Sequence, residues 1–186
     1  ELPKPLSIDD FHKVDIKKVK LGRLLFHDKI LSANRNIACA TCHSHEFGGS
    51  DGLSLGIGEG GEGLGPKRTA GVGDDKIKKR IPRNSLALWN LGFKEITTLL
   101  HDGRVTKSNI FGNNFNTPAQ EALPKGLDNI VAVQALFPMT RQFEMAGNPG
   151  ENEIIGLVSK VGKDSMRIDR VWPVITHRVR GIPEYV

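Results

Sequence analysis

The sequence lacks the features that mark several common classes of protein. Among its 186 residues, no apolar stretch approaches the ~20 residues that a membrane-spanning helix needs. The net charge is +5, but no dense basic run is interleaved with aromatic residues, which argues against nucleic-acid binding. The glycines form no G-x-x-x-x-G-K-[ST] phosphate loop. We therefore expect neither a membrane-spanning protein nor a nucleic-acid or P-loop protein.

Apolar residues are also scarce, at 38% of the chain, whereas the sequence holds 21 glycines and 10 prolines. Such a chain has little material for a hydrophobic core, although its length suits one domain. A bound group that fills the interior would compensate. The mild positive excess is typical of a solvated surface and would also help to steer an acidic partner toward the protein.

Cysteine occurs only twice, and both residues lie in the segment Cys39-Ala40-Thr41-Cys42-His43. The C-x-x-C-H spacing is the attachment signature of a c-type haem, in which Cys39 and Cys42 bond to the vinyl groups and His43 is the proximal iron ligand. A thioredoxin-like redox pair would need a βαβ context, and a zinc site would need a second ligand pair. The sequence shows neither, so it predicts one covalent haem c.

Covalent attachment of haem takes place outside the bacterial cytoplasm, and the chain begins at Glu1 rather than at Met. We therefore expect a periplasmic, exported protein from which a signal peptide has been removed. Because the haem uses both cysteines, we expect no disulfide.

The sequence pattern predicts a mainly α, cytochrome c-like domain spanning 1–186, with long Gly-rich loops and no hairpin. Ser7 and Asp10 suit a capping box. Glycines break any regular element over 44–80, a loop that we expect around the haem edge, and 105–126 reads as a second, polar loop. Helical spacing predicts helices over 16–26, 83–91 (continuing as helix or turn over 96–100), 127–136, 154–161 and 168–179.

Several short motifs occur in a fixed order over nearly the whole chain. They are Leu21–Phe26 with Leu31–Ser32, Phe47–Gly52, Arg83–Ser85 with Leu91, His101–Arg104, and Gln134–Pro138 followed by Glu144–Met145. Together with C-x-x-C-H, this series resembles the di-haem cytochrome c peroxidase family, which includes MauG-like enzymes. The likeness is to the N-terminal domain of that family, which carries the peroxide-reacting haem.

The resemblance implies reduction of hydrogen peroxide to water with electrons from a second haem. A small redox protein would donate electrons to that second haem. In the family, that second haem sits in a following domain, which has its own C-x-x-C-H. This chain has one such motif. The second haem would come from the rest of a longer chain or from a partner chain, or the protein works with one haem. The family also binds calcium between its haem domains, and Asn84 is a possible contributor.

Three positions depart from the family pattern. Leu99 stands where many members have a glutamine, and His101 replaces the tryptophan of the F-W-D-G-R motif. The catalytic glutamate of the family aligns with Ala132, unless the insertion over 105–126 shifts that role to Glu121.

A haem peroxidase needs an open sixth position at the iron and a distal group that moves a proton between the peroxide oxygens. The resemblance places His101 and Glu144 on that distal side. Met145 or His101 could instead be the sixth ligand of the iron. The simpler alternatives are a surface histidine beside Asp102 and a core methionine.

Two more residues have open roles. Trp89 stands where some members place an electron relay between the haems, although an aromatic residue of the core would look the same. Arg104 could bind a haem propionate, or hold its loop through Asp102. The leading function is thus a peroxidase-type haem domain. The alternatives are a mono-haem electron carrier or cytochrome subunit, and an enzyme that oxidises an organic or protein substrate.

Overall fold

The computed structural model describes residues 2–159 and 164–185. The fold is mixed rather than mainly α: 37% of the described residues are helical, and a small three-stranded antiparallel sheet accompanies the helices. The helices are α1 (Ile16–His27), α2 (Cys39–Cys42), α3 (Ile130–Gln134), α4 (Glu153–Ser159) and α5 (Asp164–Arg180). The strands are β1 (Thr98–Leu99), β2 (Val105–Lys107) and β3 (Phe115–Asn116). None of the described helices is long and apolar enough to cross a membrane.

Helix α1 forms where the sequence predicts it. Asp15 caps its first turn, because the carboxylate accepts hydrogen bonds from the backbone N–H groups of Lys17 (2.8 Å) and Lys18 (3.3 Å). The predicted capping box before it is also present, with the Ser7 N–H 2.7 Å from the Asp10 carboxylate, but it opens only a short 3-10 turn. Helix α1 packs against α2, so it supports the haem-attachment segment.

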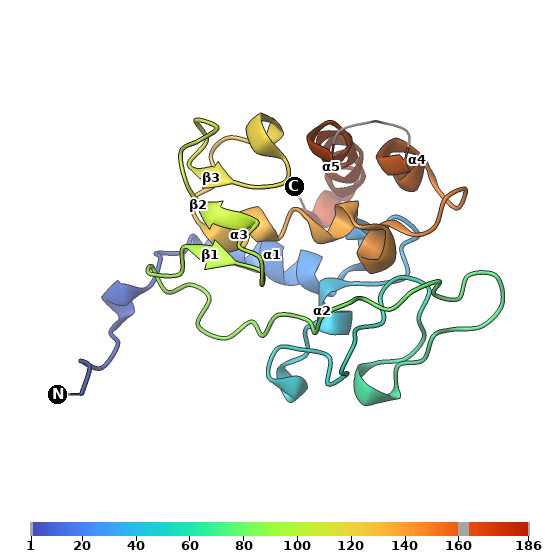
Figure 1. Ribbon diagram of the computed structural model, residues 1–186, viewed down its shortest axis with the longest axis horizontal. Coiled ribbons are helices and arrows are strands. Elements are labelled where there is room, and N and C mark those ends of the chain that lie inside the picture. Colours follow the sequence, from blue (N-terminus) through green and yellow to red (C-terminus); the bar gives the residue numbers. More distant parts are fainter. Residues whose placement is uncertain (1, 160–163, 186) are drawn as a thin grey trace.

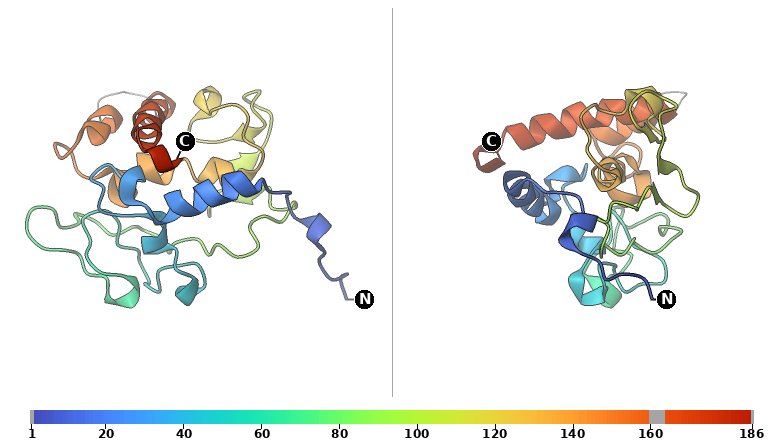
Figure 2. Two further views of the ribbon diagram at one scale, coloured as in Figure 1. Left: turned by 180° about the vertical axis from the view of Figure 1, so that it is seen from behind. Right: turned by 90° about the vertical axis from the view of Figure 1, so that its left-hand side faces the viewer.

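The apolar core lies between the C-terminal helices and the sheet. Helices α4 and α5 pack together, and Ile154 and Val171 have no exposed surface. Trp172 donates from Nε1 to the Leu136 carbonyl oxygen (2.8 Å) and meets Phe137 edge to face at 6.2 Å between ring centroids. Figures 1 and 2 show α5 on one side of the molecule and the segment 44–80 on the other, with α1 and α2 between them.

The expectation of no hairpin was wrong. Leu99 pairs with Val105, and Lys107 pairs with Phe115, so the three strands form an antiparallel meander. The H-D-G-R motif makes the turn between β1 and β2, where Leu100 and Gly103 both take φ of +67°. The prediction of helix or turn over 96–100 was therefore wrong for β1. Helix α3 covers β1 and β2 and is shorter than predicted, since Asn129 caps it.

The predicted helix over 83–91 does not form. This segment is extended against the loop after the haem motif, where Ser50 donates from Oγ to the Ser85 carbonyl oxygen (3.0 Å). A Cβ on Gly49 would lie 2.5 Å from the Leu88 nitrogen, so the two backbones nearly touch. From 48 to 97, the one named element is a 3-10 turn, Gly65–Lys67. The helices predicted near 154 and 168 are present, although Val161 lies outside the described residues.

Candidate haem site

The two cysteines lie on a single helical turn. Residues Cys39–Cys42 form α2, and the His43 N–H closes the turn on the Cys39 carbonyl oxygen (3.0 Å). The Thr41 hydroxyl braces the start of this turn by accepting from the Ala38 N–H (3.1 Å). Both sulfurs and the imidazole thus come from five consecutive residues. This local fold fits covalent attachment of haem c.

The imidazole of His43 is held by a backbone carbonyl group. Its Nδ1 lies 3.0 Å from the Gly49 carbonyl oxygen, in a loop that the Ser44–Ser50 bridge closes. A carbonyl oxygen can only accept, so Nδ1 carries the proton and Nε2 keeps its lone pair. Metal-bound histidines almost always donate their other N–H in this way. The residues present therefore fit a haem iron on Nε2.

The thiols of Cys39 and Cys42 are free and partly buried. Burial raises the pKa of both, and that of Cys42 to about 11, although the nearby Arg68 guanidinium acts in the opposite direction. The Cys42 sulfur faces the Ile57 carbonyl oxygen at 3.9 Å. The attachment turn is thus closed in by the Gly-rich loop of residues 44–80.

Buried charges in that loop were not predicted. Arg68 is 6% exposed and donates to the carbonyl oxygens of Ile57 (2.7 Å), Gly58 (2.7 Å) and Gly63 (2.8 Å). Asp51 has no exposed surface, and its Oδ2 has no hydrogen-bond partner among the described residues. Within a run of glycines, nothing in the sequence distinguishes these side chains from solvated ones.

Glu144 and Met145 lie on a π-helical turn, Gln142–Ala146, a rare form that often marks functional sites. The Glu144 residue as a whole is half-buried. Protein atoms surround its carboxyl group, and this burial raises its pKa against the lowering effect of Arg141 and Arg104. The same carboxyl group acts electrostatically on the Cys42 thiol. The Glu144 carboxyl group thus interacts electrostatically with both Cys42 and Arg104.

Met145, the next residue after Glu144, is 6% exposed and therefore buried. Its burial suits the core-methionine alternative, and its role as an iron ligand stays a prediction. Glu121 is exposed on the 3-10 turn Gln120–Ala122, and Ala132 lies in α3.

His101 and Arg104 belong to the turn between β1 and β2. Arg104 forms a two-point ion pair with Asp102, with Nε 2.9 Å from Oδ1 and a terminal nitrogen 2.7 Å from Oδ2. The hydrogen bond from Arg104 lowers the pKa of Asp102 to about 2. Arg104 thus holds its own loop, as one of the two alternatives expected, and binding to a propionate stays a prediction. His101 is exposed, and its distal role likewise stays a prediction.

Trp89 is 59% exposed, so it is not an aromatic residue of the core. Leu86 and Leu88 beside it are each 38% exposed. All three residues belong to the extended segment 85–89. That segment approaches Gly49, whose carbonyl oxygen accepts from the His43 imidazole, so it packs against the loop that orients His43.

The side-chain amide of Asn84 faces two backbone oxygens. With its nitrogen toward them, it donates to the carbonyl oxygens of Leu53 (2.9 Å) and Ser54. Asn84 thus ties its segment to the loop at Leu53 and Ser54. Its part in a calcium site, where oxygen ligands are preferred, stays a prediction.

Comparisons with known proteins identify the family. The model of the di-haem cytochrome c peroxidases (CCP_MauG) matches residues 16–185, so the chain belongs to this family, as its motifs predicted. Membership implies haem c as cofactor and a peroxidase-like oxidoreductase class.

Individual relatives match over shorter segments. Cytochrome c peroxidase Ccp of Escherichia coli strain K12 is 51% identical over 47 residues, which are 25% of this chain and 10% of the relative. Methylamine utilization protein MauG of Methylorubrum extorquens is 46% identical over 56 residues, or 30% and 16%. MauG of Methylophilus methylotrophus is 31% identical over 105 residues, or 56% and 24%. The matches thus cover less than a quarter of each relative.

Proposed function

We propose that this chain is the peroxide-reacting haem domain of a di-haem cytochrome c peroxidase or MauG-like enzyme. The observation that carries the proposal is the position of Glu144, a desolvated carboxyl group within electrostatic reach of both Cys42 and Arg104. A carboxyl group of raised pKa is suited to general acid–base work near neutral pH. It would take over the role that the family gives to the glutamate missing at Ala132.

When bound, haem c supplies the redox-active metal at which the O–O bond of hydrogen peroxide breaks. His43 would hold that metal through Nε2. Glu144 would accept a proton from the peroxide oxygen near the metal and return it to the departing oxygen, which leaves as water. The positive charges of Arg104 and Arg141 would stabilise the negative charge that develops on the oxygens. Two electrons and two protons per peroxide give two water molecules.

The electrons would come from a second haem in a further domain or a partner chain. A small redox protein in its reduced form would then reduce that second haem again. We assign the exposed apolar residues Leu86, Leu88 and Trp89 to the contact with that second haem domain. An exposed aromatic residue close to the support of the proximal ligand suits a relay. A calcium ion at Asn84 would stiffen the same surface. His101, the first residue of the H-D-G-R motif, would assist proton transfer as a second distal group.

The second candidate is a mono-haem electron carrier or cytochrome subunit. The place of Met145 beside Glu144 on the π-helical turn favours it, because a thioether on the iron would close the sixth position and raise the reduction potential. Oxidation of an organic or protein substrate is a variant of the first proposal, since it would use the same oxidised haem. Covalent haem attachment leads us to propose the periplasm for any of these roles.

Peroxide consumption tests the proposal. The haem-loaded protein, together with its second haem domain, is mixed with hydrogen peroxide and a reduced small cytochrome, and oxidation of the donor is followed. We expect turnover, and a loss of roughly 10²–10⁴-fold in Glu144→Gln, the usual contribution of a positioned acid–base group. An absence of turnover in the unmodified protein would refute the peroxidase role and favour the carrier.

A further inference from the structure

The π-helical turn that bears Glu144 and Met145 is held in place through three of its own successive carbonyl groups, which accept hydrogen bonds from residues outside the turn. The backbone carbonyl oxygen of Glu144 accepts from the Glu59 N–H (3.0 Å), and that of Met145 accepts from the Ala33 N–H (2.8 Å). The Ala146 oxygen accepts from the side chain of Asn152 (3.0 Å). A helix leaves its last carbonyl groups without partners in the helix, so these bonds satisfy them and also fix the turn in position.

The glycine before Glu59 brings the two segments into contact. A Cβ on Gly58 would lie 1.9 Å from the Phe143 oxygen and 3.0 Å from the Glu144 oxygen. No side chain fits there without movement of the backbone. The loop and the π-helical turn thus touch directly beside Glu144.

A compact group of polar side chains locks this contact to the segment before the haem motif. Glu59 is 5% exposed, and its carboxylate accepts from the side-chain amides of Asn34 (2.7 Å) and Asn36 (2.6 Å) through one oxygen. Asn34 in turn accepts from Asn152 (2.7 Å), the residue that holds Ala146. We call Asn34, Asn36 and Glu59 the amide clamp.

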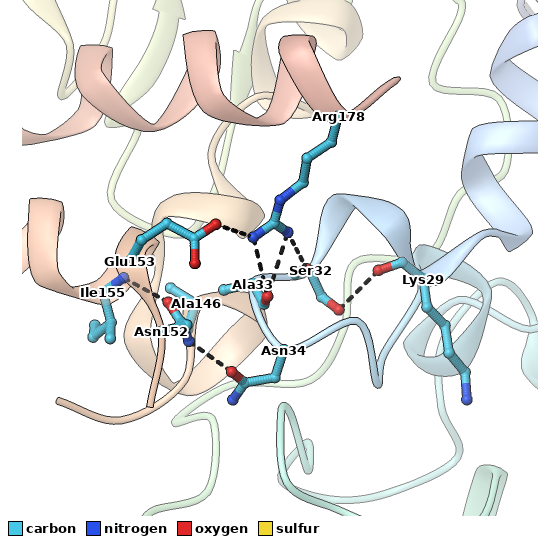
Figure 3. Close-up of polar contacts among 9 residues, drawn as sticks. All are labelled: Lys29, Ser32, Ala33, Asn34, Ala146, Asn152, Glu153, Ile155 and Arg178. Atoms are coloured by element: carbon cyan, nitrogen blue, oxygen red, sulfur yellow. Dashed lines mark hydrogen bonds and ion pairs between the residues drawn. The ribbon is translucent and has the colours of Figure 1, made fainter. Parts of the chain in front are cut away.

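Asn36 of the clamp lies three residues before Cys39, and the turn that holds it is itself braced by hydrogen bonds. The buried Ser32 hydroxyl accepts from the backbone N–H groups of Asn36 (3.1 Å) and Ile37 (3.3 Å). Arg178 of α5 donates to the carbonyl oxygens of Ser32 (3.0 Å) and Ala33 (3.3 Å). Figure 3 shows Arg178 reaching this turn from one side and Asn152 meeting Asn34 from the other.

We propose that the amide clamp is a positioning device, which sets Glu144 and Met145 relative to the Cys39–His43 turn. Asn34 and Asn36 belong to the chain leading into that turn, and Glu59 belongs to the loop that touches Glu144. The three residues themselves would not contact peroxide. The catalytic role of this positioning rests on the proposed function. The positioning itself can be measured on the haem protein without any assay of activity.

A set of variants separates positioning from general stability. Asn36→Ala removes one hydrogen bond, Glu59→Ala removes both, and Glu59→Gln retains an oxygen that accepts from the asparagines. Val171→Ala is the matched control, because it opens a buried site in α5. The haem-loaded proteins are compared by thermal unfolding, by the EPR spectrum of the ferric iron and by the rate of cyanide binding. The reaction with peroxide is measured separately.

We expect Glu59→Ala and Asn36→Ala to change the ferric EPR spectrum and to alter the cyanide association rate. Displacements of about 1 Å in a site cost up to roughly 100-fold in rate, so an effect of about tenfold is reasonable here. Glu59→Gln should recover part of it, and Val171→Ala should leave both readouts unchanged. Asn36→Ala retains the Asn34 contact, so it remains informative if Glu59→Ala does not fold.

The inference is overturned if the clamp variants lose stability as Val171→Ala does, with EPR spectrum and cyanide rate unchanged. A different result identifies failure of the proposed function: the unmodified protein would not react with peroxide, while the clamp variants still altered the spectrum and the cyanide rate.

Discussion

The Nδ1 atom of His43 lies 3.0 Å from the carbonyl oxygen of Gly49, and this contact decides which nitrogen is left for a metal. Gly49 takes φ of +78°, and a Cβ there would meet the Leu88 nitrogen at 2.5 Å. The same glycine thus orients the His43 imidazole and lets the segment bearing Trp89 approach it.

Gly49→Ala should therefore disturb the haem ligation and not only the stability. The left-handed backbone and the clash each oppose a side chain, and we expect a loss of about 1–3 kcal/mol in the free energy of unfolding. Thermal unfolding and the optical spectrum of the haem protein measure both effects. Gly73→Ala is the control, since φ is also positive there but no atom lies near the added carbon. Identical spectra for Gly49→Ala and Gly73→Ala would contradict the proposed role of the carbonyl group.

Glu144→Gln should separate activity from stability. Burial raises the pKa of this carboxyl group, so its ionised form is destabilising in the folded protein. The cost is absent below the ordinary glutamate pKa and grows as pH rises through the raised value. At neutral pH the glutamine variant should therefore unfold at an equal or higher temperature, although its reaction with peroxide is slower.

The pH dependence supplies the control for Glu144. A base acts only when it is ionised, so the peroxide rate of the unmodified protein should fall as pH drops through the raised pKa. Stopped-flow rates across the acid range should show this decline, and Glu144→Gln should not. A decline of the same shape in both proteins would assign the proton transfer to another group.

Asn84 gives a test for calcium. If its oxygen joins those of Leu53 and Ser54 around Ca²⁺, added calcium should raise the unfolding temperature of the protein with its second haem domain, and Asn84→Ala should abolish the increase. If the amide nitrogen donates to these carbonyl groups instead, Asn84→Ala should lower the unfolding temperature equally with calcium and with a chelator. Thermal unfolding under both conditions distinguishes the two orientations.

The ion pair of Glu153 with Arg178 should make a small, pH-dependent contribution to stability. The hydrogen bond from Arg178 lowers the pKa of Glu153. The ionised carboxylate is therefore stabilising above the ordinary glutamate pKa, and the contribution disappears as pH falls through the lowered value. Because the Glu153 side chain is 60% exposed, we expect less than about 1 kcal/mol from it.

Arg178→Ala should cost more than Glu153→Gln, about 1–3 kcal/mol, since it also strips donors from the carbonyl oxygens of Ser32 and Ala33. Thermal unfolding of both variants at neutral and acid pH checks this order. A loss for Glu153→Gln that persisted in acid would show that the charge of Glu153 is not the cause.

Periodicity in the sequence was enough to predict α1 and α5, because each keeps a helical pattern over several turns. It failed for β1 and β2, which are too short to show alternation and flank the H-D-G-R turn. It also failed for Leu86, Leu88 and Trp89, whose apolar side chains suggested a buried helix. A hydrogen bond from Ser50 to Ser85 and the close approach of Leu88 to Gly49, both between residues distant in sequence, accompany an extended segment instead.

In the candidate site, too, local patterns could be predicted from the sequence and long-range contacts could not. Local spacing predicted the haem-attachment turn, since all three residues of C-x-x-C-H act within five positions. The buried roles of Glu59 and Arg68 could not be predicted, because they depend on how a loop without regular structure folds back on itself. Glu144 was predicted only through resemblance, and its surroundings came from the structure.

The most direct test of the peroxide-reacting role is the EPR and optical spectrum of the ferric haem protein, before and after one equivalent of hydrogen peroxide. A high-spin iron signal that is lost on addition of peroxide, and lost more slowly in Glu144→Gln, is the predicted result. A low-spin signal that peroxide leaves unchanged, in the oxidised protein and after partial reduction, would contradict it. That outcome would identify an electron-transfer haem, with Met145 as the first ligand to replace.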